Sequence, residues 1–183
     1  SYTTGEVIDI DITFSEAVTS TGSVTVTLET GTTDQTCTFT VTSATTGTCN
    51  YTVVSGDTSS DLTVLTISGT IADAVSNAMT NFAPTTNLAA NKAIVIDTTA
   101  PTVNAGADQS KTASFTQDAT ASDATSGIST YLWSKVSGSG TITFGTGTAE
   151  DTTVSADTAD TYVIRLTVTD NAGNSASDDF TLI

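Results

Sequence analysis

The sequence predicts an all-β protein in which two β-sandwiches follow one another along the chain and are joined end to end by a short linker. The chain is rich in Thr, Ser, Val and Ile, and β-branched residues favour pleated sheet over helix. Short runs of alternating apolar and polar residues are separated by turn clusters such as TSTG, TGTT and VSGDTSSD, which is typical of sandwiches. A length of 183 residues suits two domains of about 100 residues each.

The first half contains strands whose apolar side chains share one face. In EVIDIDITF the apolar side chains of Ile8, Ile10, Ile12 and Phe14 alternate with polar ones, and this period of two marks a half-buried strand. The run DLTVLTI loses its alternation at Leu65, which predicts a bulge. Further strands are predicted in SVTVTLE (Val24, Val26, Leu28), CTFTV (Cys37, Phe39, Val41), CNYTV (Cys49, Tyr51, Val53) and AIVI (93–96).

The stretch VIDTTAPTV, residues 95–103, predicts the boundary between the two domains. An apolar run stops at Asp97, and Pro101 follows four positions later. Proline lacks an N–H and holds the preceding residue in extended geometry, so it is disfavoured inside a central strand. The sequence therefore predicts one domain over 1–97 and a second over 101–183, with a linker too short for free tumbling.

The second half repeats this pattern. Its clearest strand is YVIRLTV, in which Tyr162, Ile164, Leu166 and Val168 share one face. Trp133, the only tryptophan, lies in the middle of another strand, where we expect it to fill the core rather than to stack on a carbohydrate. The remaining strand candidates are ASFT, TITF and DDFTLI.

Charge excludes several classes of function. Twenty acidic residues face four basic ones and there is no histidine, which gives a net charge of −16. Such a surface repels the phosphate backbone, so we expect no nucleic-acid partner. No apolar run approaches the roughly 20 residues of a membrane-spanning helix, so we expect no membrane insertion. Without histidine the usual general base and zinc ligand are missing, and we expect no enzymatic activity.

The surplus of carboxylates admits two interpretations. The acids can keep a Thr-rich β protein soluble, or they can hold calcium, which takes six to eight oxygen ligands. The motif D-x-x-x-N occurs in both halves, as Asp73–Asn77 and as Asp170–Asn174. It suits a tight turn and equally a cation loop, and the sequence leaves both interpretations open.

The two cysteines are predicted to form a disulfide. Cys37 and Cys49 lie on the same face of their strands, and a hairpin centred near Ser43 would place their sulfurs opposite each other. Such a bond stabilises a domain by about 3 kcal/mol in the chain-entropy model and indicates an oxidising compartment. Two buried free thiols are the alternative.

Several motifs carry a family resemblance. YTTGEVIDIDITFSEAV, YTVVSGDTSSDL, GTIAD and VIDTTAP resemble the bacterial immunoglobulin-like repeats that occur in tandem in large surface adhesins, over residues 2–103. GADQ, ASDATSGISTYLW and TYVIRLTVTDNAGN resemble a PKD domain, over about 101–183. The resemblance implies two immunoglobulin-like sandwiches, and it implies calcium at the domain junction, with Asp97, Asp123 and Asp170 as ligands.

Two further acids are calcium candidates, Asp108 alongside the three junction residues and Asp73 as a weaker one. Asp108 lies just past the linker and can join the three junction residues, whereas Asp73 belongs to the corresponding motif of the first half. Three or four carboxylates gathered without a cation would repel one another. We therefore expect calcium to neutralise the group and to fix the angle between the domains.

The first domain departs from its family in one respect. Such repeats usually begin with a strand upstream of Y-T-x-G-E, and here only Ser1 precedes Tyr2. The resemblance thus implies that this domain lacks its first strand. Either the segment comes from a longer chain or another subunit donates the strand, because an unpaired edge would otherwise remain exposed.

Together with these observations, the family resemblance implies a non-catalytic structural or adhesive module, stiffened by calcium, on a bacterial cell surface or in a secreted protein. Two alternatives stay open: a subunit of an extracellular filament or surface layer assembled by strand donation, and an accessory module of a secreted hydrolase. The expected partners are neighbouring immunoglobulin-like domains or subunits, together with surface glycans or proteins.

Overall fold

The structure is a computed structural model that describes all residues from 1 to 183, and the chain forms two compact units, Ser1–Thr98 and Thr99–Ile183. Both units consist almost entirely of β-strands, which confirms the predicted fold class. The single helix, α1, is one short turn over Leu88–Asn91, and no helix has the length and apolar character needed to cross a membrane.

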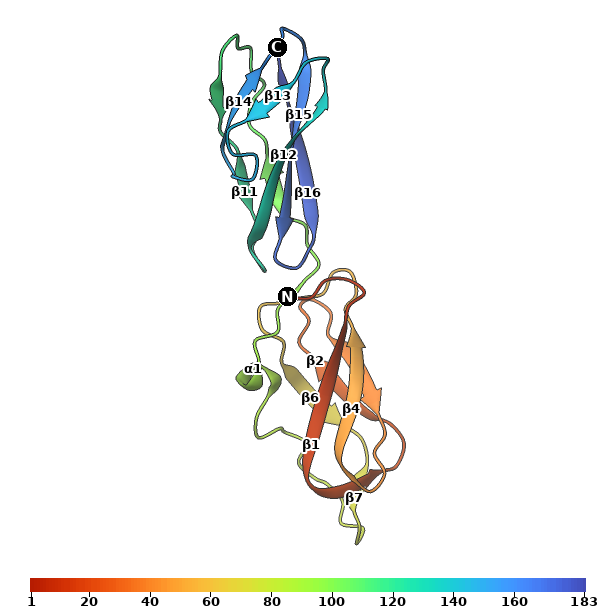
Figure 1. Cartoon of the computed structure of the whole chain (residues 1–183). Coiled ribbons are helices and arrows are strands. Elements are labelled where there is room, and N and C mark those ends of the chain that lie inside the picture. The colour runs from red at the N-terminus through yellow and green to blue at the C-terminus, as the bar shows by residue number, and fades with distance from the viewer. The chain divides into compact units, whose positions relative to one another are not determined.

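Unit 1 is built from two three-stranded antiparallel sheets and one short strand pair. One sheet has the order β4-β1-β7, the other has the order β3-β2-β6, and β5 pairs with β8. Figure 1 shows β1 and β4 side by side, with β7 at the end of this unit away from the N-terminus. The strands are β1 (Val7–Ser20), β2 (Val24–Leu28), β3 (Gln35–Phe39), β4 (Ala44–Thr52), β5 (Thr58–Ser59), β6 (Val64–Ser68), β7 (Ile71–Asp73) and β8 (Ile96–Asp97).

The alternation in the sequence predicts the core of unit 1. On β1 the side chains of Ile8 and Ile10 are buried, and those of Ile12 and Phe14 on the same face are partly exposed. The bulge predicted in β6 is present, because Thr27 pairs with Thr66 and Leu28 with Val64, so that Leu65 is the extra residue. The predicted strand over 93–96 is shorter than expected, since β8 contains only Ile96 and Asp97.

The predicted disulfide forms, but the predicted hairpin does not. Cys37 lies on β3 and Cys49 on β4, with a Cα–Cα distance of 5.5 Å. These strands belong to different sheets, because β3 pairs with β2 and β4 pairs with β1. Between them the main-chain oxygen of Val41 accepts a hydrogen bond from the amide of Ser20 as the chain crosses from one sheet to the other. The disulfide therefore joins the two sheets across the core.

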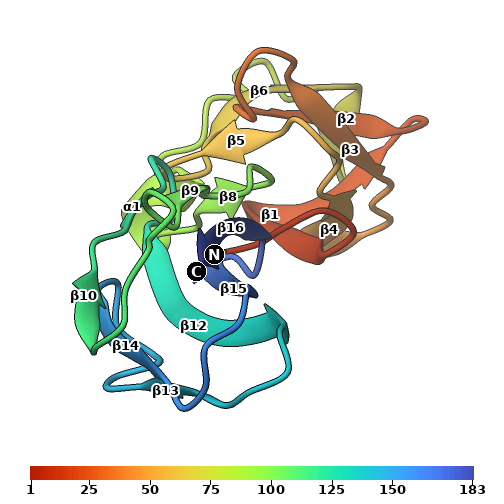
Figure 2. The ribbon, with the colours of Figure 1, turned by 90° about the horizontal axis from the view of Figure 1, so that it is seen from above.

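Unit 2 contains two three-stranded sheets and one strand pair. The sheets have the orders β12-β15-β16 and β10-β14-β13, and β11 pairs with β9. The second sheet lies together along one side of the unit, apart from β15 and β16 (Figure 2). The strands are β9 (Thr102–Asn104), β10 (Phe115–Gln117), β11 (Thr120–Ser122), β12 (Ile128–Ser137), β13 (Ile142–Phe144), β14 (Thr152–Ala156), β15 (Tyr162–Asp170) and β16 (Ser175–Leu182).

Trp133 fills the core of unit 2, as predicted. Its side chain is 3% exposed, and its ring contacts Phe180 edge-on with a centroid distance of 5.9 Å. The indole N–H donates to the main-chain oxygens of Ala149 and Glu150 at 3.1 Å, so the polar atom of this buried ring is satisfied. The face of β15 that carries Tyr162 is buried at every second residue. These contacts leave Trp133 no free face for a carbohydrate.

Candidate functional site

Two acidic loops of unit 2 lie against each other. Asp123 follows β11, and Asp170 is the last residue of β15. A carboxylate oxygen of each lies within 4.8 Å of one of the other. The side chain of Asn171 ties the loops together, because its Nδ2 donates to the main-chain oxygens of Ser126 at 2.8 Å and of Gly127 at 3.1 Å. The sequence therefore brings two of its predicted calcium ligands together within one unit.

The D-x-x-x-N motif folds into the same turn in both units. In unit 2 Oδ1 of Asp170 accepts hydrogen bonds from the main-chain amides of Ala172 and Asn174. Its Oδ2 accepts a hydrogen bond of 2.8 Å from Nδ2 of Asn174. In unit 1 Asp73 accepts the corresponding bonds, including one of 2.7 Å from Nδ2 of Asn77. Hydrogen bonds from the amide and side chain of Asn77 hold the pKa of Asp73 below its usual value. The turn-forming interpretation of this motif is correct in both units.

Asp123 accepts its hydrogen bonds on one oxygen. Its Oδ1 accepts the amides of Thr125 at 3.2 Å, Ser126 at 2.8 Å and Gly127 at 2.7 Å. Burial raises the pKa of this carboxyl, but the three amide donors outweigh burial and lower the pKa overall. Asp123 is therefore ionised at neutral pH, and its Oδ2 accepts none of these bonds. An ionised carboxylate with a spare oxygen, close to a second carboxylate, favours a bound cation.

The linker enters unit 2 at the end that carries these loops. Thr102, the first residue of β9, pairs with Ser122, which directly precedes Asp123. No lysine or arginine forms a salt bridge with Asp123 or Asp170, since the salt bridge of this protein joins Arg165 to Asp179. No basic side chain therefore pairs with the acids at this end of unit 2. The same end is the one at which the linker joins the unit.

Asp108 and Asp73 do not belong to this group. Oδ1 of Asp108 accepts the amide of Thr181 at 2.7 Å, near the end of β16, whereas the Asp170 turn precedes the start of β16. Since β16 spans eight residues, which is about 25 Å at 3.3 Å per residue, the prediction that Asp108 joins Asp123 and Asp170 is wrong. Asp73 lies at the end of β7, paired with Val18 near the far end of β1. Asp97 lies on β8 and pairs with Thr58.

Asp57 is a buried acid of unit 1 whose structural role was not predicted from the sequence. Asp57 is 3% exposed and accepts hydrogen bonds from the hydroxyl of Tyr51 at 2.6 Å, the amide of Val54 at 2.9 Å and Nε2 of Gln35 at 3.0 Å. Three donors to one carboxylate indicate a structural anchor for the turn after β4. The only signal in the sequence is that Asp57 lies within the turn cluster VSGDTSSD.

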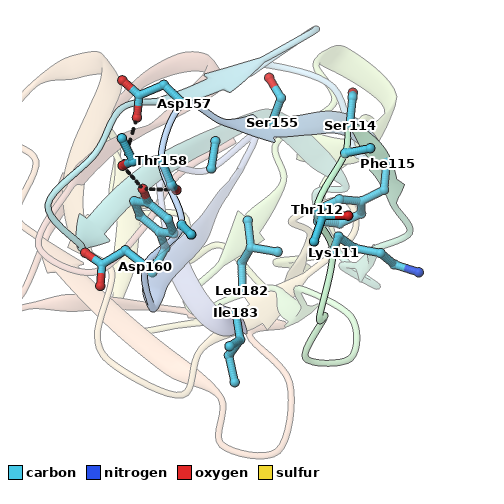
Figure 3. Close-up of a pocket in the computed structure, with 14 residues that line it drawn as sticks. Lys111, Thr112, Ser114, Phe115, Ser155, Asp157, Thr158, Asp160, Leu182 and Ile183 are labelled. Atoms are coloured by element: carbon cyan, nitrogen blue, oxygen red, sulfur yellow. Dashed lines mark hydrogen bonds between the residues drawn. The ribbon is translucent and has the colours of Figure 1, made fainter.

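Unit 2 has a small cavity near its C-terminal residues. It has a volume of about 260 Å³, and Phe115, Leu182 and Ile183 line its apolar side. Figure 3 shows Asp157 and Asp160 at its rim. The carboxylate of Asp157 accepts the amide of Thr141, and that of Asp160 accepts the amide of Ser139, and these bonds lower the pKa of both acids. Both carboxylates therefore act in turns.

Unit 1 has a larger open groove of about 890 Å³. One wall is the face of β1 that carries Ile12 and Phe14, and the other includes Ile67 on β6 together with Phe82 and Leu88 from the segment between β7 and β8. Most of these side chains are apolar and partly exposed. The groove is thus an opening into the side of the sandwich.

Comparison with known proteins finds a similarity in unit 2. Residues 105–183 match the family model described as K319L-like, PKD domain. A solution structure of the PKD domain from KIAA 1837 protein is 28% identical over 44% of this chain and 82% of that chain, with a TM-score of 0.39. Fibronectin(III)-like modules of Clostridium thermocellum CbhA are 14% identical over 100% of this chain and 87% of that chain, with a TM-score of 0.33. No curated protein sequence matches the chain.

Residues 105–183 are therefore similar to a PKD domain, and the chain as a whole has an all-β, immunoglobulin-like fold. PKD domains are structural modules and are generally non-catalytic. The similarity to a PKD domain, together with the Cys37–Cys49 disulfide, indicates an extracellular protein. The resemblance of the first half to bacterial immunoglobulin-like repeats is not among the matches and remains a prediction.

Proposed function

We propose that this chain is a calcium-stiffened spacer of an extracellular adhesin on a bacterial surface. Such a module holds an adhesive or binding domain away from the cell, so its two units must resist unfolding and bending. The observation that carries the proposal is the pair of carboxylates of Asp123 and Asp170 at the end of unit 2 where the linker enters. A cation at this end is the simplest means of stiffening the connection.

The local chemistry supports calcium as the cation. Calcium prefers oxygen ligands, and carboxylate and main-chain oxygens suit it. The loops of Asp123 and Asp170 hold both carboxylates in place through amide donors before any ion binds. Such preorganisation lowers the entropic cost of binding. Mutual repulsion of the two charges falls when a cation lies between them.

The linker supports Asp97 as a third ligand. Thr98, Thr99, Ala100 and Pro101 separate Asp97 from Thr102, so the extended chain keeps these two residues within about 17 Å of each other. Thr102 pairs with Ser122 beside the Asp123 loop. A cation held by Asp123 and Asp170 that also binds Asp97 would restrict the angle between the units, which is the property a spacer needs.

Calorimetric titration of calcium into chelator-treated protein tests the proposal. We expect heat of binding and a higher melting temperature for unit 2. Asp123→Asn and Asp170→Asn should each weaken binding by about tenfold or more, since each removes a carboxylate ligand. Asp108→Asn is the matched control, because Asp108 lies at the other end of the unit and its loss should leave calcium binding unchanged.

Two results would count against this function. If calcium produces neither heat nor a change in melting temperature, the acids serve as turn formers only. If Asp108→Asn weakens binding as much as Asp123→Asn, the ion binds through diffuse charge and not at the proposed site. Circular dichroism of each variant separates loss of a ligand from loss of the fold.

A further inference from the structure

Strand β1 of unit 1 has an open edge. One edge pairs with β4 from Val7 to Thr13. On the other edge β7 pairs only with the last residues of β1, from Val18 to Ser20. No other strand among residues 1–183 pairs with β1. The second edge is thus unpaired along most of its length, and such an edge is a template for another strand.

The register identifies which main-chain groups face this edge. The main-chain oxygen of Glu6 accepts the amide of Val53, so the alternation of an antiparallel ladder directs the groups of Ile8, Ile10 and Ile12 toward β4. The N–H and C=O groups of Asp9, Asp11 and Thr13 are then directed toward the open edge. They can pair with an incoming strand without disturbing β4.

The open groove lies beside this edge. Ile8 and Ile10, near the start of β1, are buried, whereas Ile12 and Phe14, further along the same face, are partly exposed. An alternating strand that is half covered and half open is unusual, because its apolar face is normally buried along the whole strand. The apolar side chains that a further strand would cover are Ile12, Phe14, Ile67, Met79, Phe82 and Leu88.

Charge limits what can occupy the groove. The exposed acids Asp9 and Asp11 lie along β1, Glu16 lies further along the same strand, and Asp73 lies at the groove wall. A second copy pairing through its own β1 would place its acids against these, and each copy has a net charge of −16. Like charges on adjacent strands oppose pairing. The groove therefore favours a strand with neutral or basic residues on its outward face.

We propose that this groove binds an extended β-strand donated by a different polypeptide, with apolar residues at every second position and hydroxyl or basic residues between them. The apolar residues enter the groove, and the strand extends the sheet to β4-β1-donor. Main-chain hydrogen bonds supply affinity in this mode of recognition, and the pockets for alternate side chains supply specificity. The outward basic residues pair with Asp9 and Asp11.

A peptide titration tests this inference. The probe is a synthetic peptide about nine residues long in which valine alternates with threonine between terminal lysines. The control peptide has the same composition, with its valines in one block. We expect the alternating peptide to bind about tenfold more tightly than the control and to slow amide hydrogen exchange at Asp9, Asp11 and Thr13 by about tenfold or more.

Two variants on one strand sharpen the test. Ile67 lines the groove, whereas Leu65, the bulged residue of β6, is 45% exposed outside it. Ile67→Lys should weaken the binding of the alternating peptide by about tenfold, and Leu65→Lys should leave the binding of this peptide unchanged. The comparison of the two peptides on the unaltered protein remains decisive if Ile67→Lys fails to fold.

Three outcomes would overturn the inference. The first is an absence of binding by the alternating peptide. The second is equal affinity for the two peptides, which would indicate charge attraction alone. The third is a dimer in analytical ultracentrifugation that already protects the amides of Asp9, Asp11 and Thr13 without peptide. That result would show that a second copy of this chain pairs with the open edge of β1.

Discussion

The sulfurs of Cys37 and Cys49 join β3 to β4 across the two sheets of unit 1, with their Cα atoms 5.5 Å apart. Both side chains are buried in the core, at 5% and 2% exposure. Because the bond links strands that share no main-chain hydrogen bonds, it holds the sandwich closed at a place where sheet pairing cannot.

The first prediction concerns this disulfide. Reduction, or replacement of both cysteines by alanine, should lower the free energy of unfolding of unit 1 by about 3 kcal/mol, because the unfolded chain gains freedom. Chemical denaturation with amide exchange or NMR readout of unit 1 measures the change. Trp133 is the only tryptophan and lies in the core of unit 2, so its fluorescence is an internal control that should not change. An unaltered unit 1 after reduction would refute the prediction.

The second prediction concerns alkaline pH. Burial raises the pKa of Tyr51, and the hydrogen bond to Asp57 and the negative charge of Asp57 raise it further. Because the pKa in the folded state exceeds the unfolded value near 10, this tyrosine contributes full stability below about pH 10 and progressively less as pH rises toward its folded pKa. Urea denaturation of unit 1 at about pH 8 and about pH 11 should show the loss. In Tyr51→Phe the loss between these two pH values should be smaller, and an equal loss in both proteins would exclude Tyr51 as its origin.

The third prediction concerns the turn of unit 1. Donors from Asn77 lower the pKa of Asp73, so its contribution to stability is present above the unfolded pKa near 3.9 and is lost as pH falls through the folded pKa. Carboxyl carbon NMR titration should give a pKa below 3.9 for Asp73. In Asn77→Ala the pKa should rise, because the side-chain donor is removed, while the pKa of Asp179, held down by Arg165, should not move. A pKa of Asp73 that is the same in both proteins would show that the main-chain amide donors alone lower this pKa.

Much of the fold follows from the sequence because a period of two is a local signal. The alternation of Ile8 to Phe14 specifies a strand and its inner face, and the lost alternation at Leu65 specifies a bulge. Parity also indicates that Cys37 and Cys49 both face the core. Parity carries no information on which sheet a strand joins. The predicted hairpin near Ser43 was therefore wrong, although the predicted disulfide was correct.

The candidate site shows the same limit. Asp123 and Asp170 were predicted from the family resemblance, and the structure places both in turns of unit 2. Asp108 was assigned to the junction because it follows the linker closely in sequence. Its carboxylate lies instead at the other end of β16, beside Thr181, because β9 and the residues after it carry the chain along the unit within a few positions. Nearness in sequence is therefore a poor guide to which end of a sandwich a residue occupies.

The fourth prediction is that calcium stiffens the connection between the two units. Backbone ¹⁵N relaxation gives a rotational correlation time for each unit separately. With calcium we expect both units to show one common, longer correlation time, and after chelation we expect two shorter and different values. Asp170→Asn should behave as the chelated protein does when calcium is present, and Asp108→Asn should behave as the unaltered protein does. Correlation times that are the same with and without calcium would show that calcium does not stiffen the connection.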